Sequence, residues 1–141
     1  MAGTNSAHSG FNYLSGAYSL RLSLKAHVMS RLVLVVDDEL LLLEIVCAML
    51  EELGCEPVCV DCPVKGLAKI EADPRIAMVI TDVQMPAMDG FELANRVKAQ
   101  RPDLPVVLMS GRDLGRPGYP VMKKPFSQRQ LAELIAPIAH A

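Results

Sequence analysis

Two apolar runs in this sequence end on acidic residues that can do chemistry. The β-branched run 76–81 stops at Asp82, and the run Leu32–Val36 stops at Asp37-Asp38-Glu39. In open parallel α/β sheets the carboxyl ends of the strands meet at one edge, so these acids are expected to lie together. Carboxylates gathered in this way repel one another, and a divalent cation relieves the repulsion. The pattern therefore predicts a cation site that contains Asp37, Asp38 and Asp82.

A hydroxyl and an ammonium group follow two later strand-like runs. Ser110 ends the run that begins at Pro105, and Lys124 follows the short run at Val121. Mg²⁺ suits this set because it prefers oxygen ligands, takes one or two carboxylates and leaves space for a phosphate. Three carboxylates would be balanced by Mg²⁺ and Lys124, while Ser110 and Lys124 would supply donors to new phosphoryl oxygens. The residues together predict a phosphoryl-transfer site.

Strands and helices alternate along the part of the chain that carries these residues. Expected strands cover 32–36, 56–60, 76–81, 105–109 and a short stretch from Val121 to Met122; expected helices cover 40–53, 64–72, 91–99 and a last helix from Ser127 towards Ile138. Asp89 is expected to cap the third helix, and Ser127 with Gln130 forms a capping box for the last one. This alternation predicts a parallel sheet with helices on both faces.

The fourth crossover does not fit that alternation. The sequence S-G-R-D-L-G-R-P-G-Y, residues 110–119, carries three glycines and a proline and leaves no room for a helix of ordinary length. Parallel strands are normally joined by a dozen residues or more. The fourth connection is therefore expected to be an extended loop or a single irregular turn.

The chain resembles the receiver domains of response regulators, which are the phosphoacceptor half of two-component signalling. The resemblance covers about residues 31–141 and rests on four motifs in order: Val35-Val36-Asp37-Asp38-Glu39, Asp82-Val83-Gln84-Met85-Pro86-Ala87-Met88-Asp89-Gly90, Met109-Ser110-Gly111 and Lys124-Pro125-Phe126. It implies a flavodoxin-like, doubly wound α/β fold with a five-stranded parallel sheet of order 2-1-3-4-5. The fourth helix would be short or absent.

The same resemblance implies a role for each site residue. Asp82 would be the nucleophile that accepts a phosphoryl group from a phosphohistidine of a histidine kinase or phosphotransferase. Lys124 would pair with one phosphoryl oxygen and Ser110 would bond another. The domain would be a phosphoacceptor rather than an enzyme, with only self-phosphorylation and autodephosphorylation activity. It would signal by altered binding to a downstream protein.

The resemblance also implies the magnesium ligands. Asp38 would bind Mg²⁺ directly, Asp37 mostly through water, and Asp82 and the main-chain carbonyl of Gln84 would complete the protein ligands. Glu39 is expected either to support the ligands or to be merely solvated. Gln84 would also tune the rate of autodephosphorylation, together with Arg112.

One family feature is missing from the sequence. Receiver domains usually carry a Tyr or Phe three residues before the functional lysine, and here that residue is Val121. The nearest aromatic residue is Tyr119, beside the short fourth crossover. We therefore expect intact phosphorylation chemistry with a different readout, in which phosphoryl binding orders the loop 111–120.

Composition narrows the classes of function. The chain has 141 residues, 51% of them hydrophobic, and a net charge of −2, while its first 30 residues carry Arg21, Lys25 and no acid. An acidic body without a basic stripe argues against nucleic-acid binding, and no apolar run is long enough to span a bilayer. Residues 1–30 are expected to be a flexible extension, although their Ser-rich, acid-free composition also fits a targeting peptide.

The cysteines are Cys47, Cys55, Cys59 and Cys62. No secretory signal is evident, so we expect a cytoplasmic protein with reduced thiols that act as small buried hydrophobes. A metal site made from the last three of them is the alternative, but no second C-x-x-C pair and no neighbouring histidine support it.

Two other functions remain open from the sequence. A phosphatase with an aspartyl nucleophile would want a second acid two residues after Asp82, where Gln84 stands, and a cap domain for which the chain has no length. A phosphorylation-independent interaction module would keep the fold and use only its loop surface. The capped helix near the last residue favours a free-standing receiver over a fragment of a hybrid kinase.

Overall fold

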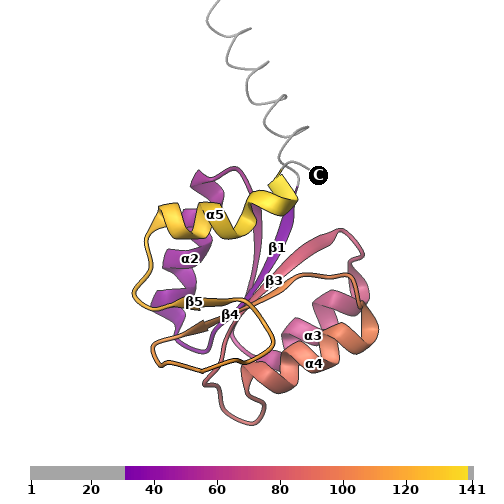
Figure 1. Ribbon diagram of the computed structural model, residues 1–141. Helices are drawn as coiled ribbons and strands as arrows, with labels where there is room; N and C mark the ends of the chain where they lie inside the picture. Colours follow the sequence, from indigo (N-terminus) through magenta and orange to yellow (C-terminus); the bar gives the residue numbers. More distant parts are fainter. Residues whose placement is uncertain (1–30, 140–141) are drawn as a thin grey trace, which may run out of the picture. The chain divides into compact units, whose positions relative to one another are not determined.

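The computed structural model describes residues 31–139, which form five strands and four helices (Figure 1). The strands are β1 (Leu32–Val36), β2 (Glu56–Val60), β3 (Ile76–Asp82), β4 (Val106–Ser110) and β5 (Val121–Lys123); the helices are α2 (Leu40–Glu52), α3 (Pro63–Ala72), α4 (Gly90–Gln100) and α5 (Gln128–Ala139). The expected extension over residues 1–30 lies outside the described residues.

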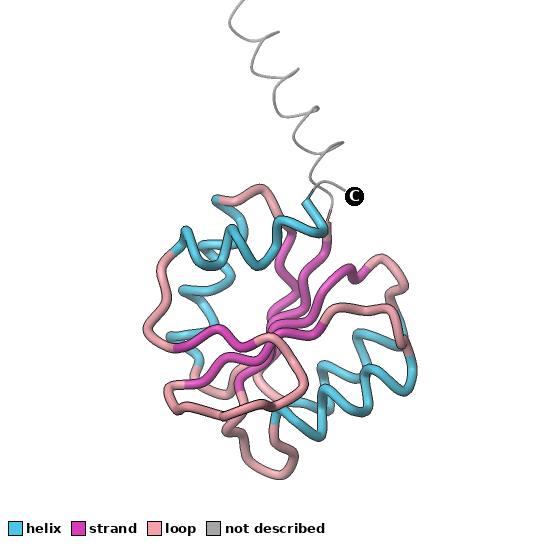
Figure 2. Tube along the Cα trace, viewed as in Figure 1, coloured by secondary structure: helices cyan, strands magenta, loops and turns pink. Residues whose placement is uncertain are grey.

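The five strands make one parallel sheet in the order β2-β1-β3-β4-β5, which confirms the predicted topology (Figure 2). The strand order reverses between β1 and β3, because the chain first steps outward to β2 and then returns past β1. Ligand sites of doubly wound sheets lie at the carboxyl end of such a reversal. The register pairs Val36 of β1 with Thr81 of β3, so the residues that follow both strands emerge side by side.

Alternating side chains on the strands build a core on each face of the sheet. On β1, Val33 and Val35 point to the face covered by α2 and α5, while Leu34 and Val36 point to the face covered by α3 and α4 (Figure 1). All four of these side chains are fully buried. Strands buried on both faces read as continuous apolar runs, which is why the sequence of β1 shows no polar residue.

The expected helix caps are confirmed. The Asp89 side chain accepts a hydrogen bond from the Glu92 amide at 2.9 Å and so begins α4. Before α5, the Ser127 amide donates to Gln130 Oε1 at 2.8 Å, and the Gln130 amide donates to Ser127 Oγ at 3.2 Å. Each cap satisfies amides that a helix leaves without intrahelical partners.

The boundaries differ from the sequence expectation by one or two residues. Helix α3 already begins at Pro63, since proline has the backbone geometry of the first helical turn and lacks only a hydrogen bond that the turn does not use. Strand β3 extends to Asp82 itself, because the Asp82 backbone pairs with Met109 of β4. The nucleophile candidate is therefore held by the sheet rather than by the loop that follows it.

No helix forms in the fourth crossover, as expected (Figure 2). Instead, Leu114 and Tyr119 pack against the core on the α3 and α4 side, together with Val121. The Tyr119 hydroxyl donates a 2.6 Å hydrogen bond to Asn95 Oδ1 on α4. The crossover thus covers this part of the core with two side chains and one hydrogen bond, in the place where a helix would otherwise pack.

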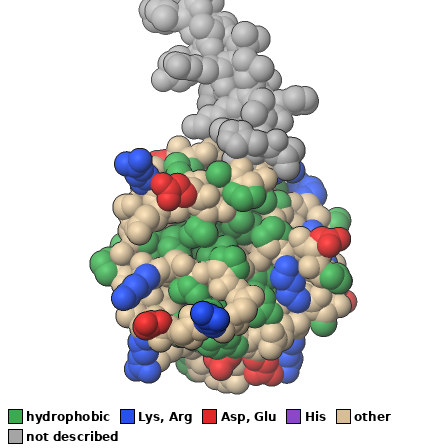
Figure 3. Space-filling model, in the orientation of Figure 1, with side chains coloured by type: hydrophobic (Ala, Val, Ile, Leu, Met, Phe, Trp, Pro, Cys, Tyr) green, Lys and Arg blue, Asp and Glu red, His purple; other side chains and the backbone are tan. Residues whose placement is uncertain are grey.

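A groove of about 520 Å³ lies between this crossover and α5. Its apolar lining includes Val107, Tyr119, Pro120, Leu134 and Pro137, and hydrophobic side chains are gathered on this face of the molecule (Figure 3). The groove is also bordered by Pro105, which precedes β4. It therefore opens near the amino ends of β4 and β5, away from the carboxylates.

The cysteines differ from expectation. Cys47 on α2 and Cys59 on β2 form a disulfide with 6.8 Å between their Cα atoms, whereas Cys55 and Cys62 are free. The prediction of four reduced thiols is wrong because Cys59 pairs with Val35 in the sheet and so faces α2. Burial raises the pKa of the Cys55 thiol, which fits its expected role as a small core residue.

Candidate functional site

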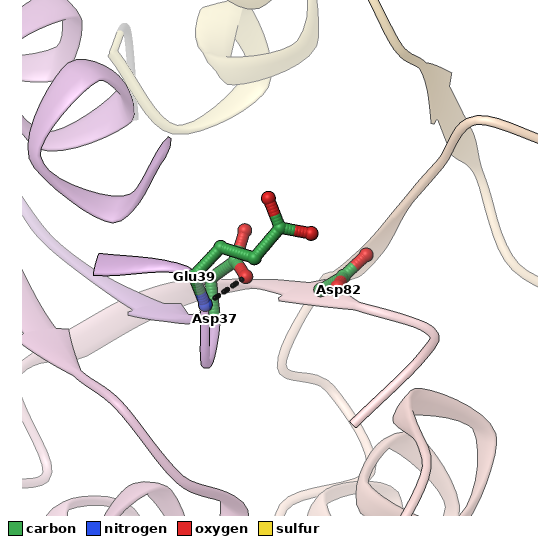
Figure 4. Close-up of side chains that lie close together, drawn as sticks. All are labelled: Asp37, Glu39 and Asp82. Carbon is green, nitrogen blue, oxygen red and sulfur yellow. Dashed lines mark hydrogen bonds between the residues drawn. The ribbon is translucent and has the colours of Figure 1, made fainter. Parts of the chain in front are cut away.

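Two buried carboxylates meet at the carboxyl edge of the sheet (Figure 4). Asp37 directly follows β1 and is 0% exposed, and Asp82 is the last residue of β3 and is 5% exposed. Glu39, which precedes α2, extends over the same space. Burying two like charges together is unfavourable unless cationic groups or donors compensate them.

Asp37 is only partly compensated by hydrogen bonds. Its Oδ1 accepts from the Glu39 amide at 3.0 Å, and its own amide donates to the Val60 carbonyl of β2 at 3.2 Å. Its Oδ2 is buried and has no hydrogen-bond partner. Burial raises the pKa of Asp37, and the nearby Asp82 charge adds to this effect, while the Glu39 amide opposes it. An incompletely satisfied buried carboxylate marks a place where a further cation is favourable.

Lys124 supplies a positive charge between the two acids. Its Nζ donates to Asp82 Oδ1 at 3.0 Å and lies 3.7 Å from Asp37 Oδ2. The backbone fixes this position, because the Lys124 amide donates to the Ser110 carbonyl at 2.8 Å. The neighbouring Lys123 is exposed. The structure thus brings the lysine directly before Pro125 into the site, as the sequence motif indicated.

Ser110 ends β4 at the same edge and is 5% exposed. It lies one residue beyond Met109, which pairs with Asp82 across the sheet. Its Oγ accepts a 3.1 Å hydrogen bond from the Arg112 amide. The hydroxyl is therefore held at the start of the fourth crossover with its own proton still available to a ligand.

The turn after β3 depends on a glycine in a way that the sequence did not reveal. The Gly90 amide donates to the Val83 carbonyl at 2.8 Å, which folds the start of α4 back onto the end of β3. A Cβ at Gly90 would collide with the Asp82 carbonyl oxygen. The residue that requires a glycine here is Asp82, because its backbone approaches Gly90 closely.

The oxygens of Asp37, Glu39 and Asp82 lie within 4.8 Å of one another and fit the donor set of a hard divalent cation (Figure 4). Asp38, which the resemblance made the direct ligand, is exposed and does not belong to this group. The Gln84 side chain is exposed too, and the role expected for its main-chain carbonyl stays a prediction. The sequence left the role of Glu39 undecided, and the structure places its carboxylate in the cluster.

Comparison with known proteins identifies the family of the chain. The family model of the response regulator receiver domain matches residues 33–136. The chain is 36% identical over 83 residues to the two-component response regulator ORR3 of rice, covering 57% of this chain and 63% of that protein. It is 32% identical over 72 residues to the probable histidine kinase 3 of rice, covering 51% of this chain but 7% of the kinase. The match therefore spans less than two thirds of either relative.

The solved structures give the same result. A response regulator receiver domain protein from Clostridium thermocellum superposes with a TM-score of 0.72 at 25% identity, covering 77% of this chain and 94% of that one. The chain belongs to the family of response regulator receiver domains. Among the residues that the structure describes, no helix is long and apolar enough to cross a membrane.

Proposed function

We propose that the chain accepts a phosphoryl group on Asp82 from a phosphohistidine of a histidine kinase or histidine phosphotransferase. The observation that carries the proposal is the 3.0 Å contact between Lys124 Nζ and Asp82 Oδ1 at a buried strand end. The family supports it, and so does the similarity to a rice histidine kinase, since receiver domains are related to both kinases and regulators. Phosphorylation would then change how the chain binds a downstream protein.

In this transfer an Asp82 carboxylate oxygen attacks phosphorus and forms an acyl phosphate. The phosphorus–nitrogen bond to the donor imidazole breaks, and its electron pair stays with the departing nitrogen. Lys124, already within hydrogen-bonding distance of Asp82 Oδ1, pairs with a phosphoryl oxygen. The Ser110 hydroxyl donates to a second phosphoryl oxygen, for which its proton is free.

Mg²⁺ is the cofactor that fits the site. Asp37, Glu39 and Asp82 would hold it through carboxylate oxygens, with Asp38 and the Gln84 carbonyl as further candidates. The orphaned Asp37 Oδ2 is the observation in favour of such an ion. When bound, the ion supplies positive charge that neutralises the carboxylates and the transferred phosphoryl group.

The test is phosphorylation by a small donor. The protein is incubated with acetyl phosphate and Mg²⁺, and its intact mass is measured. Wild type is expected to gain about 80 Da, the mass of one phosphoryl group, and Asp82→Asn to gain nothing. Asp89→Asn is the matched control, because Asp89 caps α4 and lies outside the acidic cluster, so it should gain the same mass as wild type.

Each other result favours a different function. An adduct that persists in Asp82→Asn would place the phosphoryl group elsewhere and contradict the proposal. Turnover of a phosphomonoester without a lasting adduct would favour an aspartyl-nucleophile phosphatase. If neither an adduct nor turnover occurs, a phosphorylation-independent interaction module is the better description. Chelation of Mg²⁺ should abolish the wild-type adduct.

A further inference from the structure

The Cys47–Cys59 disulfide joins helix α2 to strand β2. Cys47 lies in the middle of α2, and Cys59 is the penultimate residue of β2. Within residues 31–139, strand β2 is an edge strand that pairs with β1 alone. The crosslink therefore adds a covalent attachment to a strand that the sheet holds along one side.

The attached strand end supports Asp37. Val60, the residue after Cys59, accepts the 3.2 Å hydrogen bond from the Asp37 amide. The Val60 side chain is buried on the opposite face from Cys59 and lies close to Gly66 of α3. The end of β2 is thus held by the disulfide on the α2 face, by packing on the α3 face and by the Asp37 amide at its tip.

The crosslink is accessible to redox reagents. Cys59 is exposed, and Cys47 is 8% exposed beneath it. The free Cys55 is buried at the amino end of β2, and burial raises its thiol pKa, so it is a poor competitor. The free Cys62, three residues after Cys59, is the one other thiol of the described residues with partial exposure.

We propose that Cys47 and Cys59 form a reversible redox modification that sets how firmly β2 holds Asp37, and through it the affinity of the site for Mg²⁺. In the forward direction hydrogen peroxide is the oxidant. The Cys59 thiolate attacks one peroxide oxygen, the oxygen–oxygen bond breaks, and the departing hydroxide takes up the proton lost by the Cys59 thiol, which gives a sulfenic acid and water. The Cys47 thiolate then attacks the Cys59 sulfur, the sulfur–oxygen bond breaks, and the departing hydroxide takes up the proton lost by the Cys47 thiol to give a second water. A dithiol reverses the reaction by thiol–disulfide exchange and is itself oxidised to a cyclic disulfide. The consequence for Mg²⁺ rests on the proposed function.

The first measurement is the redox state itself, on the full chain. After hydrogen peroxide treatment the intact mass should be about 2 Da below that of the dithiothreitol-treated protein, and peptide mapping should find a Cys47–Cys59 link. Equal masses in the two states, or a link from Cys59 to Cys62 instead, would overturn the proposal. The Cys62→Ser and Cys55→Ala variants should both still form the Cys47–Cys59 link.

The second measurement is amide hydrogen exchange at Asp37 and along β2. Reduction is expected to speed exchange at the Asp37 amide on the order of tenfold, because the edge strand opens more readily without its crosslink. Cys47→Ser should show the fast exchange under both conditions, and Cys62→Ser should keep the wild-type difference. Exchange that does not change on reduction would refute the coupling even if the disulfide forms.

Calorimetric titration with Mg²⁺ gives the third readout. The oxidised protein should bind Mg²⁺ at least about threefold more tightly than the reduced one, since a better-held Asp37 loses less freedom on binding. The Asp82→Asn variant separates the two proposals. Its Asp37 exchange should still respond to reduction, because this response does not need Asp82 to be phosphorylated. A wild-type protein that gains no phosphoryl group but keeps this response would refute only the proposed function. If the wild-type protein is phosphorylated but its Asp37 amide exchange is the same in the oxidised and reduced states, only the redox coupling is refuted.

Discussion

Ser110 belongs to the acidic edge and directly precedes the fourth crossover, yet these two regions are held in different ways. At the edge, two carboxylates with little exposed surface, a lysine and several backbone hydrogen bonds lie within one small volume. In the crossover, residues 111–113 are exposed, Leu114 and Tyr119 pack against the core, and the Pro120 carbonyl accepts a hydrogen bond from the Leu108 amide. The acidic side chains at the edge are largely buried, whereas much of the crossover is exposed.

Under the proposed function, the edge would carry the chemistry and the crossover the readout. Groups that stabilise developing charge work best when they are already oriented, so the Asp82 and Lys124 positions should tolerate little change. A segment that reports phosphorylation needs two arrangements of similar free energy, which few contacts make possible. Substitutions in the two regions should therefore affect different measurements.

Removal of Lys124 should have the largest effect. Lys124→Ala leaves both carboxylates without their nearest cation, so phosphorylation by acetyl phosphate with Mg²⁺ should slow on the order of 100-fold. Lys123→Ala is the matched control, because the adjacent side chain is exposed, and its rate should stay within about twofold of wild type. Equal rates for the two variants would contradict the role of Lys124.

A methyl group at Gly90 should be the next most damaging change. In Gly90→Ala the new Cβ meets the Asp82 carbonyl oxygen, and the backbone must shift, which should lower the free energy of unfolding by about 3 kcal/mol. Gly111→Ala tests the crossover in the same way. Nothing lies within 4 Å of the position of its Cβ, so the free energy of unfolding should change by less than about 0.5 kcal/mol. Chemical denaturation of both variants measures the contrast.

Asp37 should show an effect of intermediate size that depends on pH. Burial raises its pKa in the folded chain, so the ionised form opposes folding once the pH has risen through that value. With metal removed by chelation, Asp37→Asn should raise the free energy of unfolding at neutral pH by about 1 kcal/mol. The gain should vanish at a pH below the ordinary pKa of the carboxyl group, where wild type is neutral in both states. A gain that persists in acid would point to a cause other than charge.

Loss of one hydrogen bond in the crossover should have the smallest effect. Tyr119→Phe removes the bond to Asn95 and should cost about 1 kcal/mol of unfolding free energy or less, without slowing phosphorylation. A double-mutant cycle with Asn95→Ala isolates this contact. Repeating the cycle with beryllofluoride tests the readout: a coupling energy that stays the same would exclude any role of this contact in reporting the phosphoryl group.

Much of this arrangement could be predicted because it follows from local patterns. Strands such as β1 are continuous apolar runs, and the Asp89 and Ser127 caps are short-range signals. The meeting of Asp37, Asp82 and Lys124 follows from parallel topology once the strands are identified.

Other features depended on contacts that are distant in sequence. Strand register makes Cys59 face α2, and three-dimensional packing brings Gly90 against Asp82, so neither could be foreseen from spacing alone. The orientation of an exposed side chain is weakly determined by the backbone. For that reason the sequence did not indicate that Glu39, rather than Asp38, would turn towards the site.

The ammonium group of Lys124 has a consequence beyond pairing with Asp82. Because it touches one acid and lies near the other, it acts as a tethered counterion whose effective concentration never falls when free cations are scarce. Lys124 thus offsets part of the repulsion between Asp37 and Asp82 at any ionic composition of the surroundings. An arriving metal ion must share the two carboxylates with a charge that cannot diffuse away, so occupancy should follow the magnesium supply gradually and the scaffold should remain folded throughout.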